Sequence, residues 1–239
     1  MIKFDQKPIN ESNPIIYIHI PKSGGQTMWN LFRQQQELIH VWHNRFFCKL
    51  NEPATYITNI RHPVDRVIST YYHIRRYERD PLHKPVNQMT LEEFVSWVQD
   101  ESIENKRYKS KRKLENIRYR TVNLATRYIS GGDPEDIKLA KRNLRKSFDY
   151  VGVMDYYMES LYVMQKMYGW DLSSFRKKND NPGRPKVQEI SQDLIHVIEM
   201  YNEHDIALHQ YAKERFEKKL NLLNETERYE LKDWVQQNK

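Results

Sequence analysis

The sequence predicts an α/β fold, in which a small, mostly parallel sheet carries a P-loop-like strand–loop–helix unit and is surrounded by many helices. Three observations support this fold class. Short runs of β-branched and aromatic residues alternate along the chain with longer segments of helical periodicity. Strands that alternate with helices are typical of parallel sheets. A chain of 239 residues is also long enough to bury a core without disulfides.

Three segments have the composition of buried strands. The first is PIIYIHI at residues 14–20, in which isoleucine alternates with aromatic residues. The second is TYITNI at residues 55–60, and the third is DYVGV at residues 149–153. Because these candidates are few and short, we expect a small sheet. We also expect a single domain over residues 1–239, with its core at about residues 14–216.

Helices are predicted in the segments between and after these strands. TMWNLFRQQQEL follows the first strand, and VDRVISTYYHIRR follows Pro63, a residue that fits the first turn of a helix. Thr90 and Glu93 have the spacing of a capping box, which predicts a helix over residues 90–98. Four later helices are predicted: from Asp133-Pro134 to about Lys146, from residue 158 to near Gly169, from Ile190 to about Lys219, and over residues 225–237.

Charge and composition limit the possible classes of protein. Lysine and arginine outnumber aspartate and glutamate by 39 to 32, so the net charge is +7. The single cysteine, Cys48, excludes a disulfide framework, and we expect it to be a packing residue and not a nucleophile. The longest apolar stretch is far shorter than the roughly 20 residues of a membrane helix, and the first residues lack a secretory signal pattern. We therefore expect a cytoplasmic protein without a membrane partner.

One segment concentrates the positive charge. It runs from Lys106 to Arg120 and contains eight basic residues and one acid, Glu115. Such a run is often only a solvated surface, but it also fits recognition of a polyanion, either nucleic acid or an acidic polysaccharide. No zinc-finger or RNA-recognition motif accompanies it. We therefore expect no nucleic-acid partner.

The most informative segment is the strand–loop–helix PIIYIHIPKSGGQTMWNLF. Gly24 and Gly25 allow backbone amides to approach an anion, and the helix that begins there adds its positive end. Lys22 supplies a charge, while Ser23 and Thr27 supply hydroxyl groups. These groups predict a phosphate site, although the pattern also fits a tight turn with an incidental lysine. The lysine precedes the glycines, unlike in GxxxxGK[ST], which argues against an ordinary ATPase.

A second element, NIRHPVDRVISTYY, places Arg61 at the end of a strand and Ser69 in the helix that follows. The carboxyl ends of parallel strands form the crevice in which such sheets bind ligands. The planar guanidinium group of Arg61 suits a bidentate contact with a phosphate. The structural alternative is a salt bridge between Arg61 and Asp65 at the start of the helix.

Together, PKSGGQT and RHPVDRVIST resemble the paired nucleotide motifs of the sulfotransferases. The similarity is to the branch that contains the heparan sulfate 2-O- and 6-O-sulfotransferases and their bacterial relatives. NLATRYISG, HVWHNRFF and RKKNDNPGRP resemble further segments of these proteins, and the resemblance covers about residues 14–216. Trp42 and Phe47 stand where this family has glycines, so the segment that carries His43 is the main departure.

The resemblance implies 3′-phosphoadenosine-5′-phosphosulfate (PAPS) as the donor in an in-line transfer of sulfonate to an acceptor hydroxyl, with no metal ion. It implies that Lys22 stabilises the leaving phosphate and that His43 is the general base. It also implies that Arg61 and Ser69 hold the 3′-phosphate. The other nucleotide-binding residues that it implies are Ser23, Gly24, Gly25, Gln26, Thr27, Arg127 and Arg184.

Other histidines compete with His43 for the role of base. His62 and His73 flank the helix that carries Ser69 and are the next candidates. His19 lies inside the first predicted strand, and we expect it to be structural.

The acceptor is expected to be a carbohydrate, acidic or neutral, contacted by the basic run from Lys106 to Arg120. A tyrosyl peptide or a small metabolite is the alternative acceptor. Two other functions compete with sulfonate transfer: an atypical P-loop nucleotide kinase or NTPase, and a nonenzymatic polyanion-binding module. A kinase would need a magnesium-binding carboxylate at the end of a strand, where this chain has Arg61.

Overall fold

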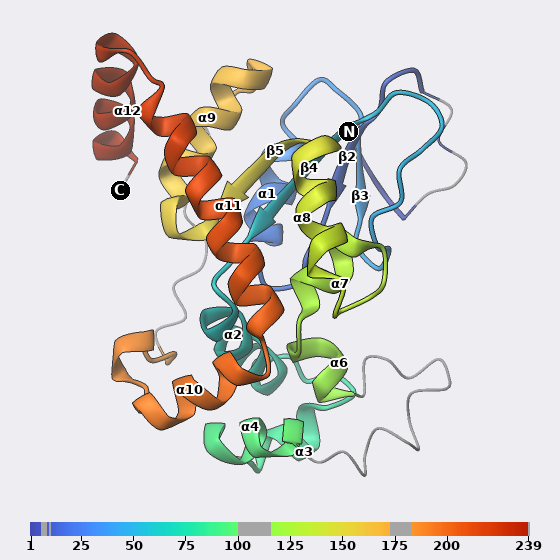
Figure 1. Ribbon diagram of the computed structural model, residues 1–239, viewed down its shortest axis with the longest axis vertical. Coiled ribbons are helices and arrows are strands. Elements are labelled where there is room, and N and C mark those ends of the chain that lie inside the picture. The colour runs from blue at the N-terminus through green and yellow to red at the C-terminus, as the bar shows by residue number, and fades with distance from the viewer. Residues whose placement is uncertain (6–8, 10, 100–115, 173–182, 239) are drawn as a thin grey trace.

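The computed structural model describes residues 1–5, 9, 11–99, 116–172 and 183–238. These residues form a central sheet of five strands in the order β1-β3-β2-β4-β5 (Figure 1). Every neighbouring pair of strands is parallel, which confirms the predicted α/β class. The strands are β1 (Ile2–Phe4), β2 (Ile15–Ile18), β3 (Ile39–Trp42), β4 (Thr55–Ile60) and β5 (Phe148–Val153).

The three predicted strands correspond to β2, β4 and β5, whereas the sequence analysis does not predict β1 or β3. β1 has only three residues at the edge of the sheet. β3 is buried along its whole length, but His40 in its middle interrupts the apolar pattern. The Nε2 atom of His40 lies 3.1 Å from a carboxylate oxygen of Glu11, so this buried polar group has a partner.

Helices cover both faces of the sheet, as an α/β fold requires. In Figure 1, α7, α8 and α11 lie in front of the sheet and α1 lies behind it. α9 ends before Gly169, and α12 has the predicted bounds. These helices are α1 (Gly25–Phe32), α7 (Leu124–Ser130), α8 (Ile137–Lys146), α9 (Tyr157–Tyr168), α11 (Glu203–Asn221) and α12 (Glu225–Gln237).

A second group of helices lies beyond the carboxyl ends of the strands, in the lower half of Figure 1. Its members share a hydrophobic cluster that includes Val64, Tyr71, Phe94 and Ile198. The predicted capping box is confirmed, because Thr90 and Glu93 exchange side-chain to backbone hydrogen bonds of 2.7 and 3.2 Å. The helices are α2 (Pro63–Arg76), α3 (His83–Asn87), α4 (Leu91–Gln99), α6 (Ile117–Thr121) and α10 (Gln192–Met200).

Three predicted helix boundaries are wrong. The helix predicted over TMWNLFRQQQEL ends at Phe32, so RQQQEL lies outside α1. α8 begins at Ile137, not at Asp133-Pro134, because the Asp136 side chain accepts the amide of Leu139 and caps the helix there. The predicted helix from Ile190 to about Lys219 is divided into α10 and α11. The break falls at Asn202, whose side chain makes long-range hydrogen bonds described below.

Cys48 is also placed differently from the prediction. It is exposed and therefore does not act as a packing residue. None of the described helices is both long and apolar enough to span a membrane.

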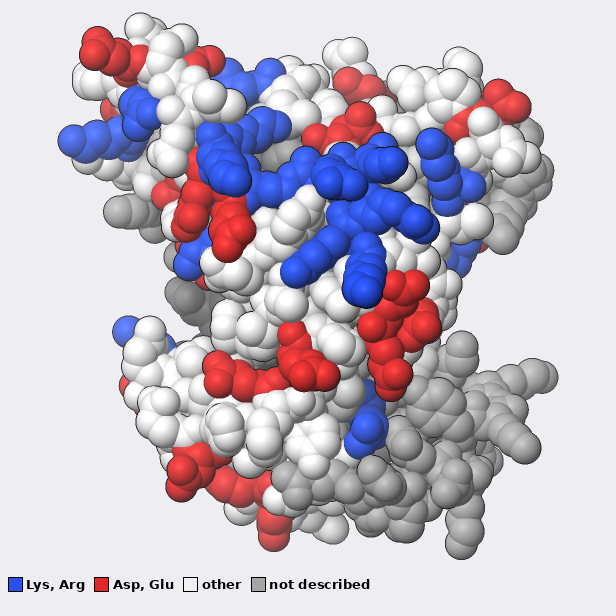
Figure 2. Space-filling model, in the orientation of Figure 1, with Lys and Arg blue, Asp and Glu red and all other residues white. Residues whose placement is uncertain are grey.

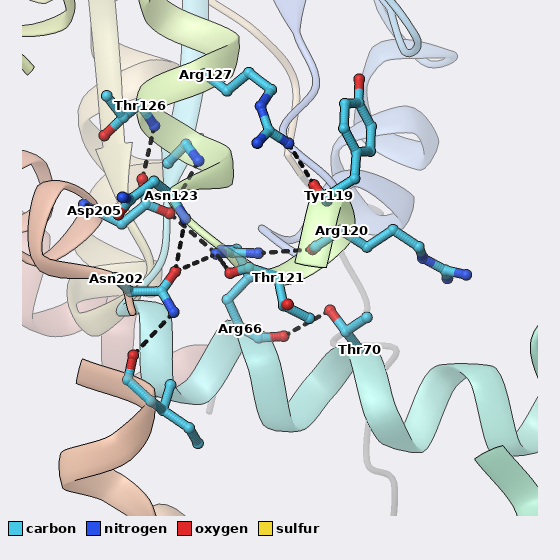
Figure 3. A network of polar contacts seen from close by, with 12 residues as sticks. Arg66, Thr70, Tyr119, Arg120, Thr121, Asn123, Thr126, Arg127, Asn202 and Asp205 are labelled. Carbon is cyan, nitrogen blue, oxygen red and sulfur yellow. Dashed lines mark hydrogen bonds and ion pairs between the residues drawn. The ribbon is translucent and has the colours of Figure 1, made fainter. Parts of the chain in front are cut away.

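A buried polar network holds α2 against α6, α7 and α11 (Figure 3). Arg66 of α2 is fully buried and pairs with Asp205 of α11 at 3.0 Å. Its guanidinium also donates to Asn202 Oδ1 and to the backbone oxygen of Thr121. Asp205 in turn accepts the amides of Ala125 and Thr126, which lie in the first turn of α7. This network fixes the orientation of α2, the helix that follows Arg61.

Candidate active site at the carboxyl edge of the sheet

The candidate site lies where four neighbouring strands end. β2 leads into the glycine-containing turn before α1, and β4 leads into Arg61 and α2. β3 ends next to His43, and β5 ends at Val153, just before Met154, whose side chain packs against Gly24. After β2 the chain moves to one side of the sheet to form β3 and then returns to the other side to form β4. Such a change of direction is the expected position of a ligand site in an open parallel sheet.

The turn between β2 and α1 has a strained backbone. Lys22 and Gly24 both have left-handed conformations, with φ of 68° and 80°. A left-handed lysine costs on the order of 1–3 kcal/mol, and such strain tends to gather at functional sites. Alternating backbone conformations of this type turn successive amides toward one point and create an anion-binding concavity. Ser23, between them, is fully buried, and its Oγ atom has no hydrogen-bond partner.

Gly25 is required by a close approach of a side chain. A Cβ atom at this position would lie 1.9 Å from Nε2 of His19, which no real contact allows. The glycine therefore lets the imidazole of His19 rest directly on the first residue of α1. The site-lining end of β2 and the start of the helix are locked together by this contact.

Three cations meet at the turn. Arg61 donates from Nη1 to the backbone oxygen of Lys22 at 2.9 Å. Arg61 and Arg184 both form ion pairs with Asp65, so the salt bridge that is the structural alternative for Arg61 is present, and its carboxylate is shared. Among the described residues, Asp65 is the only carboxylate within ion-pair distance of Lys22, Arg61 or Arg184. The buried Nε of Arg184 has no partner, so the cluster has spare donors and excess positive charge.

The excess of positive charge around Lys22 affects its pKa. Burial, followed by the charges of nearby arginines, lowers the pKa of Lys22 to about 8. Burial likewise lowers the pKa of Arg61 to about 10, and burial together with Arg61 does the same for Arg184. The arginines that act on Lys22 are Arg61, Arg76, Arg120 and Arg184.

Ser69 lies on the side of α2 that faces this cluster. It stands four residues after Asp65 and four before His73, a spacing that puts all three on one face of a helix. Burial and then the charge of Lys22 lower the pKa of His73 to about 4, which places His73 beside the lysine. Along this face of α2, the half-buried Ser69 stands between Asp65, which binds two arginines, and His73.

His43 is held by contacts on two sides. Its backbone amide donates to Asp5 Oδ1 at 2.8 Å. Its Nδ1 atom lies 2.5 Å from Nδ1 of His19, and Trp29 of α1 packs edge-on against the ring. Burial lowers the pKa of His43, partly opposed by Asp5. The ring is therefore neutral near pH 7, as a base must be before it accepts a proton.

The remaining residues implied by the resemblance do not belong to the cluster of Lys22, Arg61 and Arg184. Thr27 is buried in the first turn of α1, whereas Gln26 is exposed. Arg127 is buried in α7, where it donates to the backbone oxygen of Tyr119 at 2.6 Å and lies over that ring (Figure 3). The structure thus brings Lys22, Arg61 and Arg184 together but places Arg127 with Tyr119.

Part of the predicted surface falls outside the described residues. This applies to residues 106–115 of the basic run and to most of RKKNDNPGRP, of which Gly183, Arg184 and Pro185 are described. Arg120, at the end of the run, pairs with both carboxylate oxygens of Asp80 at 2.8 and 2.9 Å.

The other candidate base, His62, lies at the start of α2. Its ring packs against His209 of α11, and His209 lies 3.0 Å from a carboxylate oxygen of Asp155. Burial, followed by the charge of His209, lowers the pKa of His62. His62 is therefore on the β5 side of Arg61, away from the pair formed by His43 and His19.

Three residues that contribute to this site have no site role predicted from the sequence. His19 is buried, as expected of a structural residue, and it also contacts both His43 and Gly25. Arg76 and Arg120 act on Lys22 from the far end of α2 and from α6. The position of His19 three residues before Lys22 was the only available signal, because Arg76 and Arg120 are distant from the turn in sequence.

The chain matches the family model described as the Sulfotransferase family over residues 6–212. This match covers most of the sequence, so the protein belongs to the sulfotransferase family. Membership supports an enzyme that transfers a sulfonate group. No curated protein matches the chain. The described residues contain no group of three or more histidine, cysteine, aspartate or glutamate side chains that could hold a metal ion.

Proposed function

We propose that this protein transfers the sulfonate group of PAPS to a hydroxyl of a carbohydrate acceptor. The observation that carries the proposal is that Lys22, Arg61 and Arg184 lie together while only the two arginines share one carboxylate, beside a turn with an unpartnered buried hydroxyl at Ser23. A protein that only needed these cations for stability would pair each of them. Unpaired donors and excess positive charge fit a ligand that carries phosphate groups at two places.

Each part of the cluster has a role that follows from its position. The 5′-phosphate would be held by Ser23, Thr27 and the first amides of α1, where the positive end of the helix adds to the charge of Lys22. The 3′-phosphate would be held by the fork of Arg61, with Ser69 on the same side of α2. When bound, the nucleotide supplies an activated sulfonate. Lys22 then offsets negative charge at the 5′ end through a preorganised ammonium group.

His43 is proposed as the general base. It is neutral, lies at the end of the strand next to β2, and is fixed by Asp5 and His19. Nδ1 is engaged with His19, so Nε2 is the nitrogen that is available to take the proton of an acceptor hydroxyl. This assignment rests on the geometry of the histidine pair together with the sequence resemblance.

A basic surface supports an acidic acceptor. Figure 2 shows Lys and Arg gathered over α8 and α11. Along α8 there are five basic residues and no acid. None of the exposed cations of this surface forms an ion pair with a described residue, so they attract polyanions in solution. The exposed cations are Lys138, Arg142, Arg145, Lys146, Arg215, Lys218 and Lys219.

Nucleotide selectivity tests the proposed donor. Thermal unfolding is measured with adenosine 3′,5′-bisphosphate (PAP), ADP and ATP with magnesium at equal concentration. A ligand at 100 times its dissociation constant adds about 2.7 kcal/mol, which corresponds to roughly 5–10 °C for a chain of this size. We expect this shift with PAP and a much smaller one with ADP. Stabilisation by ATP with magnesium above that by PAP would instead identify a kinase or NTPase.

Acceptor screening tests the second half of the proposal. Labelled PAPS is incubated with neutral and acidic polysaccharides, a tyrosyl peptide and small alcohols. Transfer to an acidic polysaccharide is the expected result, and it should decline as salt is raised because the attraction is electrostatic. Transfer to the tyrosyl peptide alone would contradict the proposed acceptor without affecting the donor.

A further inference from the structure

The pair formed by His19 and His43 has the geometry of a direct imidazole–imidazole hydrogen bond. The two ring planes differ by 12° and the ring centroids are 4.7 Å apart, while the two Nδ1 atoms are only 2.5 Å apart. The rings therefore meet edge to edge. Two lone pairs or two N–H groups would repel at this distance, so one Nδ1 donates and the other accepts. The protonation of one ring consequently dictates that of the other.

The second nitrogen of His19 faces the phosphate turn. Its Nε2 lies against Gly25, the first residue of α1. His19 is only 5% exposed, and among the described residues Nε2 has no hydrogen-bond partner. An unpartnered nitrogen of a nearly buried ring thus lies against the backbone of the turn that is proposed to hold the 5′-phosphate. This contact joins the phosphate turn to His43 through one imidazole ring.

We propose that His19 is a positioning residue that couples an anion in the phosphate turn to the tautomer of His43, so that Nε2 of His43 becomes a base only when the nucleotide is bound. This inference rests on the proposed function, because it needs both the phosphate site and the role of His43. It adds to that function a device that keeps the base inactive until the donor has bound.

Without a ligand, the positive end of α1 and the charge of Lys22 favour a lone pair on Nε2 of His19. His19 then carries its proton on Nδ1 and donates to Nδ1 of His43. The proton of His43 is consequently on Nε2, and this nitrogen cannot act as a base. Burial, His43 and Lys22 lower the pKa of His19 to about 3, so the pair holds two protons and stays neutral near pH 7.

An anion in the turn reverses this preference. It favours an N–H at Nε2 of His19, because that group can donate to a phosphate or sulfonate oxygen. Nδ1 of His19 then becomes an acceptor for an N–H at Nδ1 of His43. Nε2 of His43 is left with a lone pair. The pair still holds two protons, so the change moves protons within the pair and with solvent without altering its charge.

Nitrogen NMR of the histidine rings tests the inference without any acceptor. The full-length protein labelled with ¹⁵N-histidine is examined at pH 7.5, with and without saturating PAP. Nε2 of His43 should change from a protonated to an unprotonated nitrogen when PAP binds. The ratio of the two tautomers should change by about tenfold to hundredfold, as expected for one hydrogen bond to an anion.

Two variants separate the relay from a merely structural effect. In His19→Gln the coupling is removed, and the tautomer of His43 should no longer respond to PAP, although PAP still binds by calorimetry. His196→Gln, an exposed histidine in α10, should retain the full response. If His19→Gln does not fold, the comparison of the wild-type protein with and without PAP decides the question alone.

The possible failures are distinguishable. If calorimetry shows that PAP binds and the tautomer of His43 is the same in both states, the relay is wrong and the proposed function stands. If PAP does not bind, the proposed nucleotide site fails and the relay fails with it. A response of His43 that persists in His19→Gln would also overturn the role of His19.

Discussion

Arg61 and Arg66 belong to the same short segment but have opposite surroundings. Arg66 is fully buried, and its charge is balanced by Asp205 and by oxygen atoms of Asn202 and Thr121. Arg61 shares the single carboxylate of Asp65 with Arg184 and lies beside Lys22. The charge of the first arginine is matched by a buried carboxylate, although its Nε atom, like that of Arg184, has no hydrogen-bond partner. The second belongs to a group whose positive charge exceeds the negative charge around it.

This difference shows how to separate a structural arginine from a binding one. Balanced burial holds elements together, and here it joins α2 to α11 and to the start of α7. A buried cation without a matching anion lowers the stability of the fold. Proteins keep such a cation where a ligand supplies the missing negative charge. Removal of the cation should therefore weaken the fold in one case and weaken ligand binding in the other.

The largest expected effect is on the balanced arginine. Arg66→Met leaves the carboxylate of Asp205 buried without its cation, which should lower the free energy of unfolding by about 3–5 kcal/mol. Denaturant unfolding measures this change. Arg145→Met, which removes an exposed cation from α8, is the matched control and should stay within about 0.5 kcal/mol of wild type. A loss below about 1 kcal/mol for Arg66→Met would show that the network is not the main support of α2.

The second effect is on ligand selectivity. Arg61→Ala should weaken PAP binding by about tenfold to hundredfold, the cost of losing a charged hydrogen bond, and should remove the preference for PAP over ADP. Arg61→Lys keeps a charge but loses the planar fork, so it should recover only part of the affinity. Titration calorimetry measures both, with Arg142→Ala on α8 as the control. Retained selectivity in Arg61→Ala would place the 3′-phosphate elsewhere.

The smallest effect concerns Lys22. If this lysine belongs to a binding site whose positive charge is unbalanced, its replacement should make the folded protein more stable, the opposite of the effect expected for Arg66. Between about pH 8 and the ordinary lysine pKa of 10.5, the unfolded chain holds a proton on Lys22 that the folded protein has released. The contribution of Lys22 to stability therefore rises with pH across this window and is unfavourable below it. Lys22→Met should raise the unfolding temperature at pH 7, by about 2–4 °C for each kcal/mol recovered.

The same variant should lose PAP-dependent stabilisation, and its advantage over wild type should shrink as the pH is raised from 7 to 10. Thermal unfolding at the two pH values measures this change. Lys138→Met, an exposed lysine of α8, is the control and should show neither effect. A Lys22→Met variant that is less stable than wild type at pH 7 would mean that the ammonium supports the turn.

Much of the fold follows from local sequence, but some boundaries do not. α2 begins at Pro63 and α4 at its capping box because these signals act within one helical turn. The break between α10 and α11 has no such local cause. It depends on Asn202, whose side chain accepts hydrogen bonds from Arg66 and from the amide of Asn123. Partners so far away in sequence cannot be identified from a local pattern.

The sequence by itself determined the glycine-containing turn before α1 and the spacing of Arg61 and Ser69, because glycine positions and helical periodicity are local properties. Only the tertiary structure decided that His19 contacts His43. The register of β2 with β3 pairs Ile18 with Trp42, so the residues that follow, His19 and His43, become neighbours. Because His40 interrupts the apolar pattern of β3, the strand is not recognised in the sequence, and its register with β2 cannot be predicted. Parallel strands acquire their partners through the packing of the whole sheet, and the edge that carries the candidate site is formed only at that stage.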